Sequence, residues 1–264
     1  MRSLLGVFFL VTGISFSSAA FENPIWGSEY YESYGARSDY RSYGKTGTIP
    51  DHLYEAASRG QRVLGYHRAR QILLGRIHLE QLSGEYAVKD VYCLRHFTNR
   101  DFRGSANLGP EKIPDGTVLN TEHTWPQSRF TGAFPNEMQK SDLHHLYPTD
   151  SEMNSTRGNY KFAELSGPTE RIKCATSRFA NTAIGFRFEP PPEHRGNVAR
   201  SLFYFSTRYK IHIDSDEEGF LRKWHHEDPV DQAEENRHQI IFENQGNRNP
   251  FIDDASLVDQ VSDF

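Results

Sequence analysis

The sequence predicts a mixed α+β fold, in which two strands and a short helix lie among longer helices drawn from both halves of the chain. Apolar residues recur at helical spacing over residues 51–82 and again over His194–Tyr209. Between these stretches, an extended run at residues 117–119 is followed by a second one at Leu143–Tyr147, and then by a helix start. With 264 residues, the chain is long enough to bury one sizeable core.

Residues 1–20 have the pattern of a secretory signal peptide. Arg2 precedes an apolar run from Leu4 to Ile14, and small residues follow at cleavage spacing. The alternative is a membrane anchor, but the run is shorter than the roughly 20 apolar residues that a spanning helix needs. We therefore expect a protein that is exported to the periplasm or the medium and has no membrane span. The Tyr-, Ser- and Gly-rich residues 21–50 are expected to form an N-terminal extension.

Glycines divide the helical pattern over residues 51–82. Gly60 and Gly65 predict either two helices or one kinked helix. The Ser83-Gly84 pair ends this pattern, and alternating residues predict a strand over Tyr86–Leu94.

The C-terminal part of the chain is predicted to be helical after a poorly patterned stretch at residues 164–192. The helix over His194–Tyr209 carries a wide apolar stripe, which indicates packing against the core. The Asp228-Pro229 pair is expected to start a later helix that Gly246 ends. Residues 255–264 are acidic and are expected to form a mobile tail.

The composition is that of an ordinary globular protein, with 25% charged and 36% hydrophobic residues. The net charge is −5, and it becomes −6 (−5 minus 1) without residues 1–20, whose only charged side chain is Arg2. This charge excludes a generally basic nucleic-acid-binding protein. A nucleic-acid substrate would have to be held by a local basic patch and a metal ion.

The chain has two cysteines, Cys93 and Cys174. In an exported protein, an even number of cysteines indicates a disulfide, here one that closes a loop around the central stretch. The alternative is two buried free thiols. A metal-binding role is disfavoured because neither a CxxC motif nor a Cys-His spacing is present.

Glu122 and His123 end the first extended run, and Asn154 lies early in the helix that follows the second. A carboxylate and an amide oxygen suit a hard cation such as Mg²⁺, which leaves its other positions to water and phosphate. His123 is then the natural general base, because histidine ordinarily titrates near working pH. Neighbouring strand residues point to opposite faces, so a bulge or the strand end must redirect one of them. This set of residues predicts phosphodiester hydrolysis.

The segments TEHTWPQSRF and SDLHHLYPTDSEMNSTRGNY, which contain these residues, closely resemble the bacterial endonuclease I family. Those proteins are secreted or periplasmic nucleases with a ββα-metal (His-Me finger) core. The later segments RGNVARSLFYFSTRY, LRKWHHEDPVDQAEENRHQII and QGNRNPFID are also similar to that family, in the same order. The resemblance covers residues 51–254, which we expect to form one catalytic domain.

The resemblance implies specific roles for the three central residues. His123 is expected to be the general base, and Glu122 and Asn154 are expected to bind one Mg²⁺, with Mn²⁺ or Ca²⁺ as alternative ions. The implied substrate is DNA, often together with RNA, and the implied products carry 5′-phosphate ends. We expect the protein to act as a monomer.

The helix after the second extended run has more than one interpretation. Thr149 and Glu152 have the spacing of a capping box, and Ser151 is an alternative N-cap. Arg157, in the same helix, can contact the scissile phosphate, or it can pair with Glu152 or Glu164.

Asp142, His144 and His145 also have two interpretations. They can orient the site through hydrogen bonds, or they can simply pack in the core. With His123 they also suggest an alternative function, a zinc-dependent hydrolase, although no HExxH motif is present. A third alternative is an exported binding protein without catalytic activity.

Overall fold

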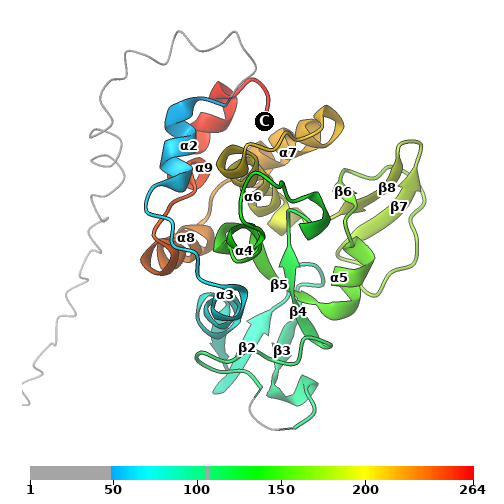
Figure 1. Cartoon of the computed structure of the whole chain (residues 1–264). Coiled ribbons are helices and arrows are strands. Elements are labelled where there is room, and N and C mark those ends of the chain that lie inside the picture. Colours follow the sequence, from blue (N-terminus) through cyan, green and yellow to red (C-terminus); the bar gives the residue numbers. More distant parts are fainter. Residues whose placement is uncertain (1–48, 105–106) are drawn as a thin grey trace, which may run out of the picture. The chain divides into compact units, whose positions relative to one another are not determined.

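The computed structural model of this protein describes residues 49–104 and 107–264. The expected signal peptide and nearly all of the expected 21–50 extension therefore lie outside the described residues. Within the described ranges, no helix combines the length and the apolar character needed to cross a membrane. Helices and small sheets are mixed along the chain, so the predicted α+β class is confirmed (Figure 1).

The α-helices are α2 (Asp51–Ser58), α3 (Tyr66–Ile72), α4 (Asn136–Lys140), α5 (Ser151–Arg157), α6 (Pro192–Tyr209), α7 (Ser215–Glu227), α8 (Gln232–Gln245) and α9 (Pro250–Asp253). A π-helical turn, η1 (Leu73–Ile77), continues α3. The 3₁₀ helices are η2 (Asn99–Asp101), η3 (Gln127–Arg129), η4 (Leu143–His145) and η5 (Ala255–Gln260).

The strands form three small sheets in the described part of the chain. One sheet contains β1 (Leu79–Leu82), β2 (Glu85–Lys89) and β3 (His96–Thr98), in that order. A second sheet pairs β4 (Leu119–His123) with β5 (Leu146–Asp150). The third has the order β6 (Lys161–Phe162), β8 (Gly185–Glu189), β7 (Arg178–Thr182).

The β4–β5 pair and α5 form the predicted strand, strand and helix. The strands are antiparallel, with Leu119 opposite Asp150 and His123 opposite Leu146, and α5 begins directly after β5. Leu119 and Leu146 belong to the core cluster that also contains residues of α3, η1, β2 and α8. One face of the β4–β5 sheet therefore packs on the core, and this packing holds the two strands in register.

The second strand differs from the prediction in its start, its end and the cap that follows. Residues 143–145 form the 3₁₀ helix η4, because the Asp142 carboxylate caps it by accepting from the His144 amide at 3.1 Å. The strand then runs through Pro148, which a two-stranded sheet tolerates on its outer edge. The α5 cap is Asp150, which accepts from the amides of residues 152 and 153; neither Thr149 nor Ser151 is the N-cap.

Helix α6 is the central element of the C-terminal part. It contacts α2, α7 and α9, which lie around it in Figure 1. Val198, Leu202, Phe205 and Tyr209 are buried, so the prediction of a core-facing stripe is confirmed. The Gly246 cap of α8 is also confirmed, because Gly246 has a left-handed φ of 92°. That helix starts later than predicted, with Asp231 as its N-cap.

Three predictions for the remaining sheets are wrong. The strand predicted over Tyr86–Leu94 ends at Lys89, and a turn follows at residues 91–93. The helical pattern over residues 51–82 ends at Ile77, and Leu79–Leu82 form β1, which pairs with β2 across the Ser83-Gly84 turn. The poorly patterned stretch at 164–192 contains the β7–β8 hairpin, in which Phe179 lies opposite Phe188.

The expectation of a mobile C-terminal tail is also wrong. Leu257, Val258, Val261 and Phe264 are buried. The Phe264 ring stacks on Phe203 of α6 with centroids 4.2 Å apart. Within η5, Leu257 and Val258 face the core, and the one acidic residue, Asp259, is exposed.

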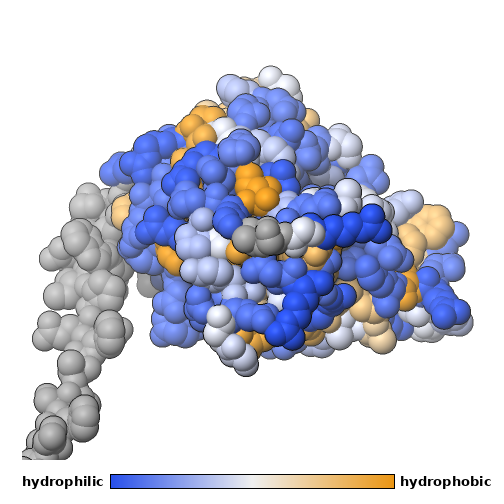
Figure 2. Space-filling model, turned by 90° about the horizontal axis from the view of Figure 1, so that it is seen from below, coloured by the Kyte–Doolittle hydropathy of each residue, from blue (hydrophilic) through white to orange (hydrophobic). Residues whose placement is uncertain are grey.

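Cys93 and Cys174 form a disulfide bond, with Cα atoms 5.5 Å apart, as expected. The bond joins the turn between β2 and β3 to the segment before β7, and the loop that it closes contains β4, β5 and α5. The surface view in Figure 2 is mostly hydrophilic with scattered apolar patches on the visible face.

Candidate active site

The end of β4, the start of η3 and the exposed side of α5 surround a cavity of about 320 Å³. The three residues predicted to carry the chemistry, Glu122, His123 and Asn154, all line it. The remaining lining residues are mostly polar; they are Tyr66, Asn120, Thr121, Pro126, Gln127, Ser128, Gly158 and Asn159.

The strand end, not a bulge, brings Glu122 and His123 to the same cavity. The β4–β5 register is continuous through His123, so no residue is inserted into the ladder. The strand stops there, and Pro126 then starts η3. Trp125 is buried in this turn, where its indole N–H donates to the Arg129 carbonyl at 3.2 Å. The turn closes the cavity on the His123 side.

His123 is held in one tautomer by its two neighbours. Its Nε2 lies 3.1 Å from the Lys140 carbonyl oxygen, which can only accept, so Nε2 carries the proton. The Gln127 amide nitrogen, a donor, lies 3.4 Å from Nδ1, which agrees with an unprotonated Nδ1. Burial, together with neighbouring His145, holds the pKa of His123 well below its usual range. The imidazole is therefore neutral, with Nδ1 available as a proton acceptor.

Glu122 is buried, with one oxygen fully occupied. Its Oε1 accepts from the Tyr92 hydroxyl at 2.9 Å and lies 3.1 Å from the Arg157 guanidinium. Burial raises the pKa of Glu122, and Arg157 and the Tyr92 hydrogen bond offset part of that effect. Both partners contact Oε1, so Oε2 is left for a ligand in the cavity.

Asn154 faces the same cavity from the first two turns of α5. No hydrogen bond joins its side chain to another residue in ranges 49–104 and 107–264. The free Oε2 of Glu122 and the amide oxygen of Asn154 are hard oxygen donors, which suit Mg²⁺ with most of its remaining positions filled by water or phosphate. This donor set fits the metal that the sequence predicts.

A sequence model of the endonuclease I family matches residues 61–256 of this chain. The chain belongs to the endonuclease I family. An extracellular ribonuclease of Bacillus subtilis (strain 168) is 35% identical over 176 residues, which are 60% of this chain and 57% of the relative. A periplasmic deoxyribonuclease of Aeromonas hydrophila is 32% identical over 123 residues, 45% of this chain and 49% of the relative. The alignments thus span about half the length of these relatives.

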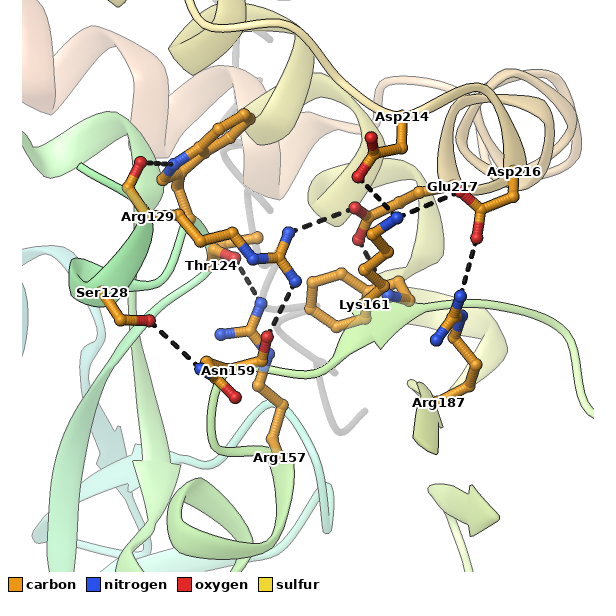
Figure 3. A network of polar contacts seen from close by, with 12 residues as sticks. Thr124, Ser128, Arg129, Arg157, Asn159, Lys161, Arg187, Asp214, Asp216 and Glu217 are labelled. Atoms are coloured by element: carbon orange, nitrogen blue, oxygen red, sulfur yellow. Dashed lines mark hydrogen bonds and ion pairs between the residues drawn. The ribbon is translucent and has the colours of Figure 1, made fainter. Parts of the chain in front are cut away.

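In this endonuclease I family member, Arg157 lies behind the cavity and is not among its lining residues. It is buried, and its guanidinium donates to the backbone carbonyls of His123 and Thr124 besides pairing with Glu122. Figure 3 shows it pointing from the end of α5 toward Thr124. It pairs with neither Glu152 nor Glu164. The predicted phosphate contact does not agree with this burial, because Arg157 has no free side toward the cavity.

Arg129 belongs to the same polar network behind the cavity. It lies between α7 and the segment that follows α5 (Figure 3). Its guanidinium is 3.3 Å from the Glu217 carboxylate of α7 and donates to the Asn159 carbonyl at 2.7 Å. Lys161 extends the network toward α7 by pairing with Asp216 at 3.1 Å. These ion pairs fix α5 and the strand end relative to α7.

The two histidines of η4 point in different directions. His145 lies behind His123, with the two ring centroids 5.3 Å apart, and its Nε2 donates to the Gln139 carbonyl at 2.8 Å. His144 packs on Tyr204 with centroids 4.4 Å apart. His145 can thus orient His123, whereas His144 belongs to the packing around α6.

Asp142 is a structural centre and not a site residue. Its carboxylate accepts from the hydroxyls of Tyr204 and Tyr209, both at 2.8 Å, and from the amides of Gln61 and Gln245. These partners come from α6, α8 and the segment after α2. No group of three or more His, Cys, Asp or Glu in the described residues is arranged to hold a metal ion. The zinc-hydrolase alternative therefore lacks its ligand set.

Three residues that contact the predicted site were not found from the sequence. Tyr92 holds Glu122 from 30 positions away, and Lys140 contributes only a carbonyl, so neither carries a local pattern. Gln127 lies within the recognised TEHTWPQSRF segment, and its distance of four residues from His123 was the one available signal.

Proposed function

We propose that this protein is an exported endonuclease that hydrolyses phosphodiester bonds of DNA, and of RNA as a second substrate, with one Mg²⁺ and His123 as general base. The observation that carries this proposal is that His123 lies in one cavity with the side-chain oxygens of Glu122 and Asn154. Its Nε2 is bound to the Lys140 carbonyl, and among the described residues its Nδ1 has only the 3.4 Å contact with Gln127. The names of the relatives, an extracellular ribonuclease and a periplasmic deoxyribonuclease, support the substrate class and the export. The β4–β5–α5 unit is proposed to be a ββα-metal (His-Me finger) core.

The proposed metal ligands are Glu122 and Asn154. When bound there, Mg²⁺ would supply positive charge to the phosphate and to the leaving oxygen. Glu122 is preorganised for this role because Tyr92 and Arg157 fix its other oxygen. Asn154 is held by the Asp150-capped first turn of α5. The remaining cavity, lined by polar groups, has room for the substrate phosphate.

The proposed base step uses His123 alone. Its Nδ1 takes a proton from a water molecule aligned with the phosphorus opposite the leaving O3′, and the Lys140 carbonyl stabilises the resulting imidazolium through Nε2–H. Attack from that side leaves 5′-phosphate and 3′-hydroxyl ends. His145, packed behind the ring, keeps its orientation during the transfer.

The proposal is tested by plasmid digestion with Mg²⁺ and with a chelator. We expect His123→Ala to lower the single-turnover rate by about 10²–10⁴-fold with little effect on metal affinity, because a positioned base contributes that much. Glu122→Ala and Asn154→Ala should instead require far more Mg²⁺. Asn236→Ala is the matched control, since Asn236 is an exposed helical asparagine away from the cavity. Full activity of the unmodified protein in chelator would overturn the metal-dependent mechanism.

Export is proposed to follow from cleavage after residue 20. The mature protein, recovered from periplasm or medium after expression in a bacterial host, should begin at Phe21 by N-terminal sequencing. Retention of residues 1–20 on the recovered protein would contradict the proposed signal peptide.

A further inference from the structure

Among the described residues that line the catalytic cavity, none is a lysine or arginine. Arg157, the cation expected there, is buried behind the cavity and bound to carbonyl groups and Glu122. The net charge of the chain is −5, so attraction by the protein as a whole does not hold an anionic strand. Cations close to the cavity edge must therefore be found elsewhere.

Two such cations lie over one aromatic ring at the cavity edge. Tyr66 lines the cavity, and its ring centroid is 5.4 Å from that of His123. The Lys140 ammonium lies 4.5 Å from the Tyr66 ring centroid, and the Arg70 guanidinium lies 5.7 Å from it. Tyr66 and Arg70 are one turn apart on α3, so they share a helix face.

The backbone around this cluster is held firmly. Tyr66 follows Gly65, whose φ of 75° turns the chain into α3, and the Tyr66 amide donates to the Glu137 carboxylate of α4. Lys140 ends α4, and its carbonyl accepts from His123 Nε2. The Lys140 side chain therefore starts from the same residue that fixes the general base.

Neither Arg70 nor Lys140 has a carboxylate partner among the described residues. The Nε–H of Arg70 is buried and has no hydrogen-bond acceptor there. By contrast, Arg68 on the same helix is paired with Glu111. A neutral ring offers a cation only about 0.5–2 kcal/mol. Both side chains thus keep donors for an oxygen ligand.

We propose that Arg70 and Lys140, together with Tyr66, form a subsite for a phosphate that flanks the cleaved one in the bound strand. The proposal rests on the proposed nuclease function and adds to it the cationic contact that Arg157 does not make. Guanidinium and ammonium donors that lie near the same ring suit phosphate oxygens. The Tyr66 ring can stack against the sugar or base next to that phosphate.

The test measures binding of a single-stranded oligodeoxynucleotide in chelator, by fluorescence anisotropy, over a range of salt concentrations. Each lost phosphate contact should lower the slope of log affinity against log salt by about 0.7. Because both cations contact the same phosphate, we expect Lys140→Gln and Arg70→Gln each to lower the slope by no more than about 0.7, and the double variant to lower it by about 0.7 in all. Lys140→Arg should restore the slope. With Mg²⁺, the same variants should raise KM.

Lys210→Gln is the matched control. Lys210 also lies over a tyrosine ring, 4.2 Å from the Tyr54 centroid, and borders a different cavity. Its slope should equal that of the unmodified protein. If the unmodified protein cleaves DNA and the Lys140 and Arg70 variants keep the full slope, the subsite is overturned and the nuclease function stands. If the unmodified protein neither binds nor cleaves, both proposals fail together.

Discussion

Arg157 shows how one buried side chain can organise a site without entering it. Replacing it by methionine should remove the partner of buried Glu122 and the donors to two carbonyls. We expect Arg157→Met to lower the free energy of unfolding by about 3–5 kcal/mol, the usual cost of breaking a buried ion pair. Urea unfolding followed by circular dichroism measures this loss.

The same variant separates a positioning role from a phosphate contact. If Arg157 only positions other groups, Arg157→Met should reduce the cleavage rate. The salt dependence of oligonucleotide binding in chelator should stay unchanged, since no phosphate contact is lost. If the slope of log affinity against log salt concentration falls by about 0.7 instead, Arg157 contacts a substrate phosphate.

Tyr92 supports the proposed metal site from behind. Its hydroxyl occupies Oε1 of Glu122 and so directs Oε2 to the cavity. We expect Tyr92→Phe to raise the Mg²⁺ concentration needed for half-maximal cleavage by about 10–100-fold. Groups that orient a metal ligand have effects of that size. Tyr86→Phe, at a tyrosine outside the site, is the control. An unchanged Mg²⁺ titration would mean that Arg157 alone orients Glu122.

Residues that belong to local motifs could be predicted, and residues brought in by the fold could not. Glu122, His123 and Asn154 were found because their chemistry and spacing restrict the choices. Tyr92 reaches the site because the turn after β2 lies against β5, where the Val91 amide donates to the Pro148 carbonyl, and no local pattern encodes this contact. For Arg157 the sequence indicated the position correctly, but only the packing shows that its guanidinium is buried.

At the scale of elements, periodicity predicted α6 and the strand–strand–helix order but misplaced several boundaries. η4 was expected to be extended because an apolar run does not distinguish a strand from one helical turn. Residues 143–145 form a helical turn because the Asp142 carboxylate caps it. Side chains from α6 and α8 hold that carboxylate in place through hydrogen bonds. The β7–β8 hairpin was missed because its strands are short and because Arg187 and Glu189, charged residues that suggest an exposed loop, are buried in ion pairs.

Residues 255–264 were wrongly predicted to be mobile, because the prediction used only their acidic composition. Phe264 is 2% exposed, lies against Phe203 and Phe251, and its carbonyl accepts from the Ile213 amide at 2.6 Å. We expect Phe264→Ala to destabilise the protein by about 3–5 kcal/mol, as for other buried phenylalanines. Phe242→Ala, at a position that is 38% exposed, should cost clearly less. Equal midpoints for the two variants in urea would show that the segment does not contribute to the core.

At the scale of the whole molecule, several buried histidines link stability to pH. Burial is the main cause that lowers the pKa of His144 and His194 to about 3 and that of His145 to about 4. In the unfolded chain these groups take up protons near their ordinary value of 6.5. Between the two values the unfolded state binds more protons, so stability is fully present above pH 6.5 and is lost as the pH falls.

His194 offers a direct test of this link, because it is buried between Tyr92 and Tyr147 and makes no contact with the proposed metal ligands. Each such group should lower the free energy of unfolding by about 1.4 kcal/mol per pH unit between pH 6.5 and 4. In His194→Leu, we expect the slope of unfolding free energy against pH to be smaller by that amount in the same window. Unfolding at pH 8, where the imidazole is neutral in both states, measures the packing effect of leucine and provides the baseline. If the slopes of the two proteins are the same below pH 6.5, His194 takes up a proton in the folded state, and the acid sensitivity must come from other groups.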